Sequence, residues 1–332
     1  MTDLRNPQTA TTDDIEIVAG TSPAPVAGSP GAPRRAGPLE IFGSMPITIK
    51  LATLWLLFVV LGAIYAKLDV SVFGGALPLQ DPALQNNGFD AATGEFRNGE
   101  PNEPMSADHF LGTDVLARDT FSRVLHGAWV SLSVSISSAL IGVGIGGLLG
   151  SLVGFLRGRV ETLTMAAIDT ILAFPALVLL LAVISLFEVR SLLLICALIG
   201  FLSIPTYTRV ARATSLAVSN REFVLAAEAI GTKPRKILLR EILPNVLPVL
   251  MAYALVAAAV VIVVEGALAF LGLSVPPPTS SWGTMINEAR RDIKENFFQV
   301  VVPSMAMIFT VLSLNQVGDW FQRRAAHRSS AL

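Results

Sequence analysis

The feature that most constrains this chain is a set of long segments without a single charged residue. Five of them contain no Asp, Glu, Lys or Arg: 51–66, 127–156, 191–208, 242–264 and 296–318. In a sixth, 162–187, the only charge is Asp169. A helix needs about 20 apolar residues to cross the hydrocarbon core of a bilayer, and in lipid it can pair its backbone groups within its own segment. The sequence therefore predicts an all-α integral membrane protein with six transmembrane helices.

The positions of the basic residues predict the orientation of the chain in the membrane. With both termini cytoplasmic, the segments on that side carry 16 of the 24 Lys and Arg residues. Because Lys and Arg favour cytoplasmic loops, we expect both termini to be cytoplasmic. We expect the lipid bilayer to surround the chain and no nucleic acid to bind it.

The expected domain organisation follows from these helices. Residues 1–40 are rich in Pro, Gly, Ala, Ser and Thr, which predicts a disordered cytoplasmic tail; they lack the apolar stretch of a signal peptide. The first transmembrane helix is expected within 41–66, followed by an irregular, exposed extracytoplasmic loop at 67–122. A core of five further transmembrane helices occupies 123–325, and 326–332 form a second cytoplasmic tail.

Four glycines spaced by four residues lie along one side of the second predicted membrane helix. They are Gly142, Gly146, Gly150 and Gly154. Such a stripe lets a neighbouring helix backbone approach closely. The spacing therefore predicts a tightly packed helix bundle.

The most informative segment is the predicted cytoplasmic loop 218–244, VSNREFVLAAEAIGTKPRKILLREILP. Ser219 begins a capping-box pattern, so a helix is predicted to start there. Gly231 can take the left-handed conformation that ends a helix. Pro234 is placed to begin a second short helix, which Pro244 is expected to close.

The first of these short helices carries one apolar face. Four residues with helical spacing form it: Phe223, Ala226, Ala227 and Ile230. A short element of this kind suits insertion into a groove on a partner protein. It would equally suit a helix lying on the membrane surface. The residue pattern alone leaves both alternatives open.

A set of small and apolar residues in this loop resembles a known motif. The set is Ala226, Ala227, Gly231, Leu243 and Pro244. It resembles the EAA loop of binding-protein-dependent ABC importer permeases, with Leu225 in place of the family's leading Glu and Glu241 in place of its usual Ile. In that family the loop is a coupling helix that docks into a cleft on a cytoplasmic ATPase. The resemblance therefore implies ATPase-coupling roles for these five residues and for Phe223 and Ile230.

Two further segments resemble the peptide and nickel branch of this family. Residues 110–134, FLGTDVLARDTFSRVLHGAWVSLSV, resemble its LGTDxxGRDxxSRxxxGxRxSL signature, with Ala117 in place of Gly and Trp129 in place of an Arg. Residues 270–286, FLGLSVPPPTSSWGTMI, resemble its FLGLGxxPPxPSWGxMI segment. The order of features over about 40–325 resembles the C-type subunit of dipeptide and oligopeptide permeases.

The resemblance implies a type I ABC importer-like transmembrane domain in the bacterial inner membrane, acting as a non-catalytic transport subunit. It implies three kinds of partner: a second homologous permease, two cytoplasmic ATPase subunits that bind ATP and Mg, and an extracytoplasmic solute-binding protein. The chain has no GxxxxGK[ST] motif to cradle phosphates, and we expect it to bind no cofactor or metal. A dipeptide or oligopeptide is the expected solute; a nickel chelate, a haem-like ligand or another small solute stays open.

Two carboxylates fall inside predicted membrane helices, Asp169 and Glu265. A charge at the bilayer centre costs about 3 kcal/mol on insertion scales, so each is expected to face protein or water. Each is a candidate for the translocation pathway or its gate, and each could instead hold helices together through hydrogen bonds. A channel or secondary transporter, the rival from another class, would predict paired intramembrane charges or internal repeats. The sequence offers only two isolated carboxylates and no convincing repeat.

Overall fold

The computed structural model describes residue 43 and residues 45–72, 79–90, 95–98, 100–187, 190–294 and 296–330. The tail predicted at 1–40 lies outside the described residues. Residues from Met45 to the C-terminus form one compact unit, separate from Met1–Ser44. All elements named below belong to that larger unit.

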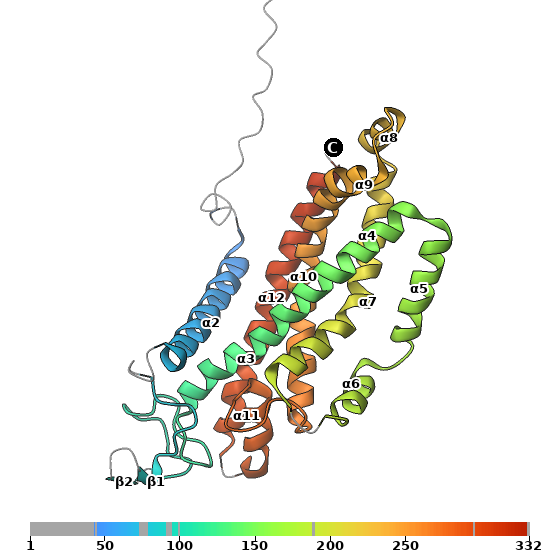
Figure 1. Ribbon diagram of the computed structural model, residues 1–332. Coiled ribbons are helices and arrows are strands. Elements are labelled where there is room, and N and C mark those ends of the chain that lie inside the picture. Colours follow the sequence, from blue (N-terminus) through green and yellow to red (C-terminus); the bar gives the residue numbers. More distant parts are fainter. Residues whose placement is uncertain are drawn as a thin grey trace, which may run out of the picture. The chain divides into compact units, whose positions relative to one another are not determined.

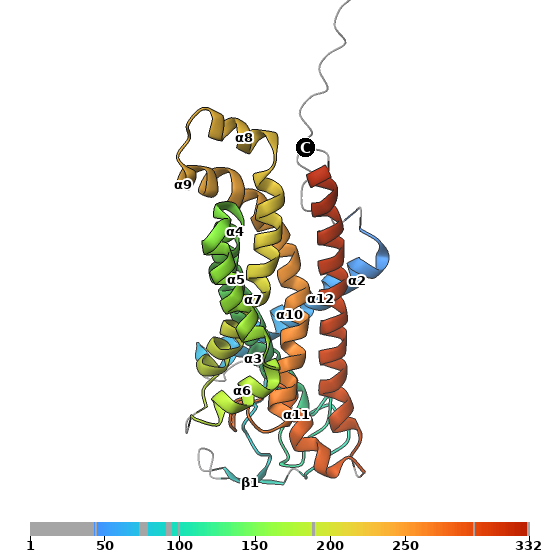
Figure 2. The ribbon, with the colours of Figure 1, turned by 90° about the vertical axis from the view of Figure 1, so that its right-hand side faces the viewer.

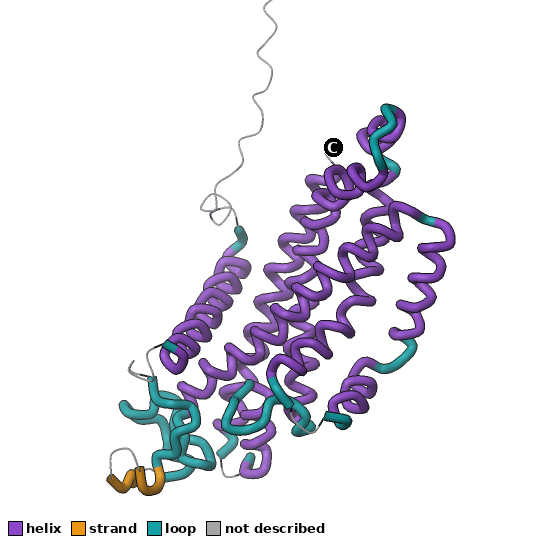
Figure 3. Tube along the Cα trace, in the orientation of Figure 1, coloured by secondary structure: helices purple, strands orange, loops and turns teal. Residues whose placement is uncertain are grey.

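Helices make up most of the described chain, with one small two-stranded hairpin (Figure 3). The elements in chain order are α2 (Ile47–Ser71), β1 (Asn87–Asp90), β2 (Glu95–Asn98), α3 (Thr120–Ile141), the π turn η1 (Gly142–Gly146), α4 (Gly147–Leu156), α5 (Gly158–Leu172), α6 (Ala176–Ile184), α7 (Leu192–Ser219), α8 (Glu222–Ala229), α9 (Pro234–Ile237), the π turn η2 (Leu238–Ile242), α10 (Leu243–Phe270), α11 (Trp282–Ala289), the 3-10 turn η3 (Arg290–Asp292) and α12 (Phe298–Ser330).

Five helical stretches are long and apolar enough to cross a membrane. They are Ile47–Asp69, Thr120–Leu156, Leu192–Ser219, Pro234–Phe270 and Phe298–Arg324. The pair α5 and α6 provides a sixth if it is counted as one span. The predicted helical membrane fold is therefore confirmed, and the β1–β2 hairpin within 67–122 is its one departure from an all-α chain among the described residues.

The third predicted helix is not continuous. α5 and α6 meet at an angle of 76°, and the break falls just before Pro175, which is the N-cap of α6. Proline has no N–H to continue the helix and its ring crowds the preceding turn, while the residue before it, Phe174, is disfavoured in helical conformation. The sequence contains this signal: the helix predicted within 162–187 is present as a pair of helices that are bent at Pro175.

The fourth helix is longer than its charge-free run of 191–208. α7 continues to Ser219 and carries Arg209 and Arg212 within it. Ser219 is the last residue of α7, and its hydroxyl donates to the Ser215 carbonyl oxygen at 2.7 Å. The predicted cap at Ser219 was therefore wrong: α8 begins at Glu222 and has no side-chain cap.

Helical backbone runs without a break from Pro234 to Phe270 through η2. Pro244 lies in the first turn of α10 and does not close the preceding helix. The π turn η2 immediately before Pro244 interrupts the regular hydrogen-bond ladder of the α-helix, so the proline can lie inside a continuous helical stretch. The prediction that Pro244 ends a separate short helix was wrong, and α9 is instead joined directly to the long membrane helix α10.

The glycine stripe packs against α7, as the close-packing prediction requires. A Cβ atom added at Gly146 would lie 2.7 Å from the carbonyl oxygen of Ile204, and one added at Gly154 would lie 2.7 Å from that of Arg212. No side chain fits at such distances. The backbones of η1 and α4 therefore touch that of α7 along this seam.

Two ends of the unit matter for function. α8 and α9 lie at one end, where α12 also finishes, and α11 lies at the opposite end near the hairpin (Figures 1 and 2). We refer to them as the α8 end and the α11 end. α10 runs between them, from η2 at the α8 end to the loop before α11.

Candidate functional site

α8 is attached to the bundle through one buried side chain. Val224 is fully buried and belongs to an apolar cluster that includes Val218 of α7, Ile237 of α9 and Ile242 of η2. Ala227 is half-buried and packs against the same cluster. These contacts fix which side of the short helix faces the protein.

The other side of α8 exposes apolar side chains. Phe223, Ala226 and Ile230 are all exposed, and Ile230 exposes 82% of its surface. At 100° per residue these three lie between roughly 100° and 160° around the helix axis from Val224. They form the apolar patch, which points away from the anchored side of the helix.

Gly231 ends α8 in the way its sequence position predicts. Its φ of +74° is in the left-handed region that favours glycine. Its N–H donates to the Glu228 carbonyl oxygen at 2.9 Å, and the Thr232 N–H donates to that of Ala227 at 3.0 Å. The turn places Ile230 at the exposed tip of the helix, beside the exposed basic residue Lys233.

The structure brings together only part of the predicted site. Phe223, Ala226, Ile230 and Gly231 share one exposed surface, whereas Ala227 turns inward. The remaining two lie at the start of α10, after η2, where Leu243 is half-buried and Pro244 is exposed. The predicted residues thus divide into an exposed tip and its attachment to a membrane helix.

Asp169 is not an isolated carboxylate. Its Oδ1 lies 2.5 Å from Nη2 of Arg209 on α7, and the side chains expose 58% and 51% of their surfaces. Glu161 and Arg212 form a second, less exposed ion pair between α5 and α7. The expectation of isolated carboxylates was therefore wrong for Asp169, because Arg209 had been assigned to a loop outside the membrane helix.

Glu265 lies at the other extreme of exposure. Its side chain is fully buried, and it accepts hydrogen bonds from the hydroxyls of Ser131 at 3.2 Å and Ser274 at 2.9 Å. These partners come from α3 and from the loop after α10. Glu265 therefore joins three segments near the α11 end.

A cluster of four buried or half-buried charges lies at the α11 end, and sequence reasoning missed it. We call Asp114, Arg118, Arg123 and Glu288 the four-charge cluster. Arg118 donates to Asp114 through Nε at 2.7 Å and to Glu288 through Nη2 at 2.5 Å. Arg123 donates through Nη1 to Asp114 and, at 3.0 Å, to Glu288. The two carboxylates and two guanidinium groups balance in charge and tie the segment before α3 to α11.

The pKa of Asp114 depends on both its burial and its charged neighbours. Burial alone raises the pKa of Asp114, but the guanidinium groups of Arg123 and Arg118 and the hydrogen bonds from Arg118 outweigh it and lower the pKa below its usual value. Asp114 is therefore ionised in the folded protein at neutral pH. This part of the loop predicted as exposed is buried: Asp114 exposes 6% of its surface and Arg118 4%.

Hydrogen bonds extend this attachment to α12. Gln299 donates through Nε2 to the Thr113 carbonyl oxygen at 2.6 Å and accepts from the Thr120 hydroxyl at 2.9 Å. Asp119 caps α3 by accepting the Ser122 N–H at 2.7 Å. The signature residues at 111–123 thus build a fixed structure at the α11 end.

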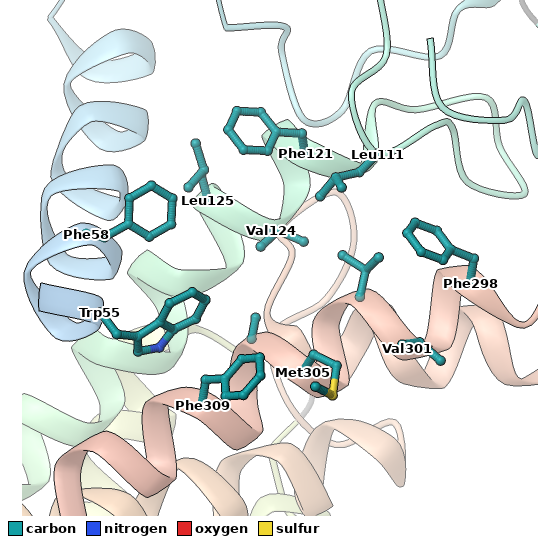
Figure 4. A pocket seen from close by; sticks show the side chains of 12 residues that line it. Trp55, Phe58, Leu111, Phe121, Val124, Leu125, Phe298, Val301, Met305 and Phe309 are labelled. Atoms are coloured by element: carbon teal, nitrogen blue, oxygen red, sulfur yellow. The ribbon is translucent and has the colours of Figure 1, made fainter. Parts of the chain in front are cut away.

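An apolar pocket of about 360 Å³ lies between α2, α3 and α12 (Figure 4). Trp55 and Phe58 come from α2, while Phe298 and Phe309 come from α12. All twelve lining residues are apolar or aromatic. The pocket therefore has no charged group for a hydrophilic solute.

Among the described residues, no group of three or more His, Cys, Asp or Glu side chains is arranged to hold a metal ion.

Comparison with known proteins identifies the family. Residues 146–330, more than half of the chain, match the family described as "Binding-protein-dependent transport system inner membrane component". The chain belongs to this family. It is therefore an inner-membrane protein and the permease subunit of an ABC importer, a non-catalytic membrane component.

Several curated relatives are similar over most of their length. A glutathione transport system permease protein from Pectobacterium atrosepticum is 35% identical over 218 residues, which are 66% of this chain and 72% of that protein. A di/tripeptide transport system permease protein from Pseudomonas aeruginosa is 37% identical over 217 residues, covering 65% and 71%. Among solved structures, an inward-facing MetNI methionine ABC transporter matches with a TM-score of 0.47 and 17% identity, covering 61% of this chain and 96% of that one.

The family match confirms the predicted resemblance and the importer class. It also decides against a channel or secondary transporter. The sequence argument against that rival relied on the absence of paired intramembrane charges and of internal repeats, and the Asp169–Arg209 pair removes the first of these two observations. The assignment of the chain as an importer permease therefore rests on its family membership and not on its pattern of charges.

Proposed function

We propose that this permease forms a translocation pathway for dipeptides or oligopeptides together with a second homologous permease. The relatives named for glutathione, di/tripeptide and peptide transport support this solute class. A nickel chelate or another small solute is the alternative. The single observation that carries the coupling part of the proposal is the apolar patch at the α8 end.

The patch has the properties of a docking surface. Phe223 and Ile230 expose apolar area to water at no benefit to this chain alone, since burial of such area is favourable. Val224 fixes the opposite side of α8 to the bundle, so the patch faces away from the bundle. This orientation favours insertion into a groove on a partner protein over a helix lying on the bilayer.

In the proposed complex the α8 end and both termini are cytoplasmic. Two ATPase subunits, which bind ATP and Mg, receive the patch together with Ala227 and Gly231. Leu243 and Pro244 begin the continuous path from this segment into α10. Closure of the ATPases on ATP would move α8, and the buried Val224 would pass that movement to α7 and α10.

The α11 end is then extracytoplasmic and receives a solute-binding protein. Its four-charge cluster supports a surface that does not deform when the binding protein docks. Asp169 is proposed to line the pathway. Glu265, buried and hydrogen-bonded, is proposed to position the outer loop after α10 at a gate without touching the solute.

The experiment that tests the proposal is purification of the tagged chain from its native membrane in mild detergent, followed by mass spectrometry. Recovery of an ATPase, a second permease and a binding protein is expected. The ligand carried by that binding protein then separates peptides from nickel chelates. Recovery of the chain alone, as a homo-oligomer without an ATPase, would refute the proposed assembly.

A further inference from the structure

We propose that Asp169 and Arg209 form a water-facing binding site on the wall of the pathway. This site binds the two charged ends of a peptide. Asp169 would pair with the ammonium group of the solute and Arg209 with its carboxylate. This inference rests on the proposed function, because it assigns a solute-contacting role within that pathway.

The pair lies within two helices that are candidates for membrane spans. Arg209 precedes the end of α7 at Ser219 by ten residues, and Asp169 follows the start of α5 at Gly158 by eleven. At 1.5 Å per residue both lie about 15 Å from the α8 end of their helices. The hydrocarbon core of a bilayer is about 30 Å thick. The two groups therefore lie at a matched distance from the α8 end, about three helical turns along α5 and α7.

Exposure at this depth calls for an aqueous environment. Both side chains expose more than half of their surface, and each charge facing lipid at the bilayer centre costs about 3 kcal/mol. Leu163, on another side of α5, exposes 72% of its surface and suits lipid. The charged side of the α5–α7 seam and the apolar side of α5 are thus distinct surfaces.

The pair suits a solute with free termini. At neutral pH a peptide carries one ammonium and one carboxylate group, the same two charges that Asp169 and Arg209 present to each other. Exchange of partners leaves every charge paired. The exchange also costs little, since an exposed ion pair contributes about 0–1 kcal/mol. A dipeptide spans about 7 Å, so the pair must open to hold both ends.

The Glu161–Arg212 pair supplies a matched control. It joins the same two helices with the same charges, but its side chains expose only 18% and 35% of their surfaces. Glu161 lies in the first turn of α5, nearer the α8 end. It can fasten α5 to α7 while offering less surface to a solute.

The first test measures water access in the assembled importer, reconstituted in lipid bilayers. Asp169→Cys and Arg209→Cys are made in a Cys196→Ser background, which removes the buried native thiol. A charged, membrane-impermeant thiol reagent should modify both at least tenfold faster than Leu163→Cys. Rates as slow as that of Leu163→Cys would overturn the proposal, because the pair would then face lipid or a partner's surface.

The second test measures uptake of a dipeptide with free termini at saturating loaded binding protein. The neutral double variant Asp169→Asn with Arg209→Gln should lower the maximal rate at least tenfold without changing the melting temperature. The double variant Glu161→Gln with Arg212→Gln should stay within twofold of the unmodified importer. Equal uptake by the Asp169 and Arg209 variant would overturn the inference alone. Absence of uptake by the unmodified importer would refute the proposed function as well.

Discussion

The two ends of this permease are built in opposite ways. At the α11 end, buried charged and polar side chains pair with one another, as in the four-charge cluster and the contacts of Gln299. At the α8 end, buried Val224 and half-buried Ala227 anchor a short helix, and Phe223 and Ile230 beside them are exposed. The first end pairs its buried charges within this chain. The second exposes apolar area that the proposed ATPase subunits would cover.

Because of this difference, substitutions at the α11 end should affect the stability of the chain, whereas substitutions at the α8 end should affect its coupling to the ATPases. Loss of a buried charge partner at the α11 end should lower the free energy of unfolding, since the remaining charge is left buried without its partner. Loss of an exposed apolar side chain at the α8 end should leave stability unchanged and impair association. Substitutions at the two ends should therefore show up in different measurements.

The largest expected effect is at Asp114. Asp114→Asn removes the carboxylate that both Arg118 and Arg123 contact, which should cost about 3 kcal/mol of stability and lower the melting temperature by about 4 °C. Thermal unfolding of the purified chain in detergent measures this. Glu228→Gln, on the exposed α8, is the control and should leave the melting temperature unchanged. An unchanged value for Asp114→Asn would show that the cluster does not hold the α11 end.

The pH dependence of the melting temperature tests the role of Asp114 further. Because the folded pKa of Asp114 is lowered, its ionisation stabilises the protein fully above the unfolded Asp pKa of about 4 and less as pH falls further through the folded pKa. The melting temperature should therefore fall more between pH 5 and pH 3 in the unmodified chain than in Asp114→Asn. Parallel curves for the two proteins would contradict the assignment of this acid sensitivity to Asp114.

At the α8 end the clearest substitution is Ile230→Glu. Loss of a central docking residue costs about 2 kcal/mol, or roughly 30-fold in binding, so uptake should fall at least that much while the melting temperature stays the same. Ile230 is a better site than Ala227, which is half-buried and supports the fold. Glu228→Gln again serves as the control. Normal uptake by Ile230→Glu would refute the coupling role of the patch.

A smaller effect is expected at Gly231. Its φ of +74° is costly for alanine, and a Cβ atom there would meet nothing within 4 Å, so Gly231→Ala should cost about 1 kcal/mol for conformational reasons alone. Gly144, which also has open space around it but no positive φ, is the matched control. Gly144→Ala should be neutral or stabilising. Equal melting temperatures for both variants would argue against conformational cost at Gly231.

The smallest effect is expected at Ala117, where the family signature has glycine. Ala117 has a φ of 55° and is fully buried. Ala117→Gly should gain about 1 kcal/mol by relieving the left-handed conformation and lose about 0.8 kcal/mol by removing a buried methyl group. The melting temperature should therefore change by no more than about 1 °C. A large decrease would mean that the methyl group itself is essential to packing at the α11 end.

Much of the fold could be predicted from local sequence signals. Charge-free runs located the membrane helices because the bilayer excludes unpaired charge over a fixed thickness. The left-handed Gly231 and the glycine stripe were predictable because each depends on a property of glycine itself. Pro175 was a local signal too, and its effect on the third helix was overlooked.

What could not be predicted depends on partners far away in sequence. α7 was ended too early because Arg209 and Arg212 looked like loop charges until Asp169 and Glu161 were placed beside them. The spacing of Asp114 and Arg118 hints at an ion pair, but Glu288 lies 170 residues beyond Arg118. No local pattern indicates which distant charge completes such a cluster.

The most direct test of the contrast is hydrogen–deuterium exchange of the chain alone and in the assembled importer. Amides of 222–230 in α8 should exchange rapidly in the isolated chain and become protected in the complex with its ATPases. Amides of 282–289 in α11 should be protected equally in both when no solute-binding protein is present, because that protein is proposed to dock at the α11 end. If α8 exchanges at the same rate with and without the ATPases, the apolar patch is not their docking surface, and the proposed coupling through the α8 end is wrong.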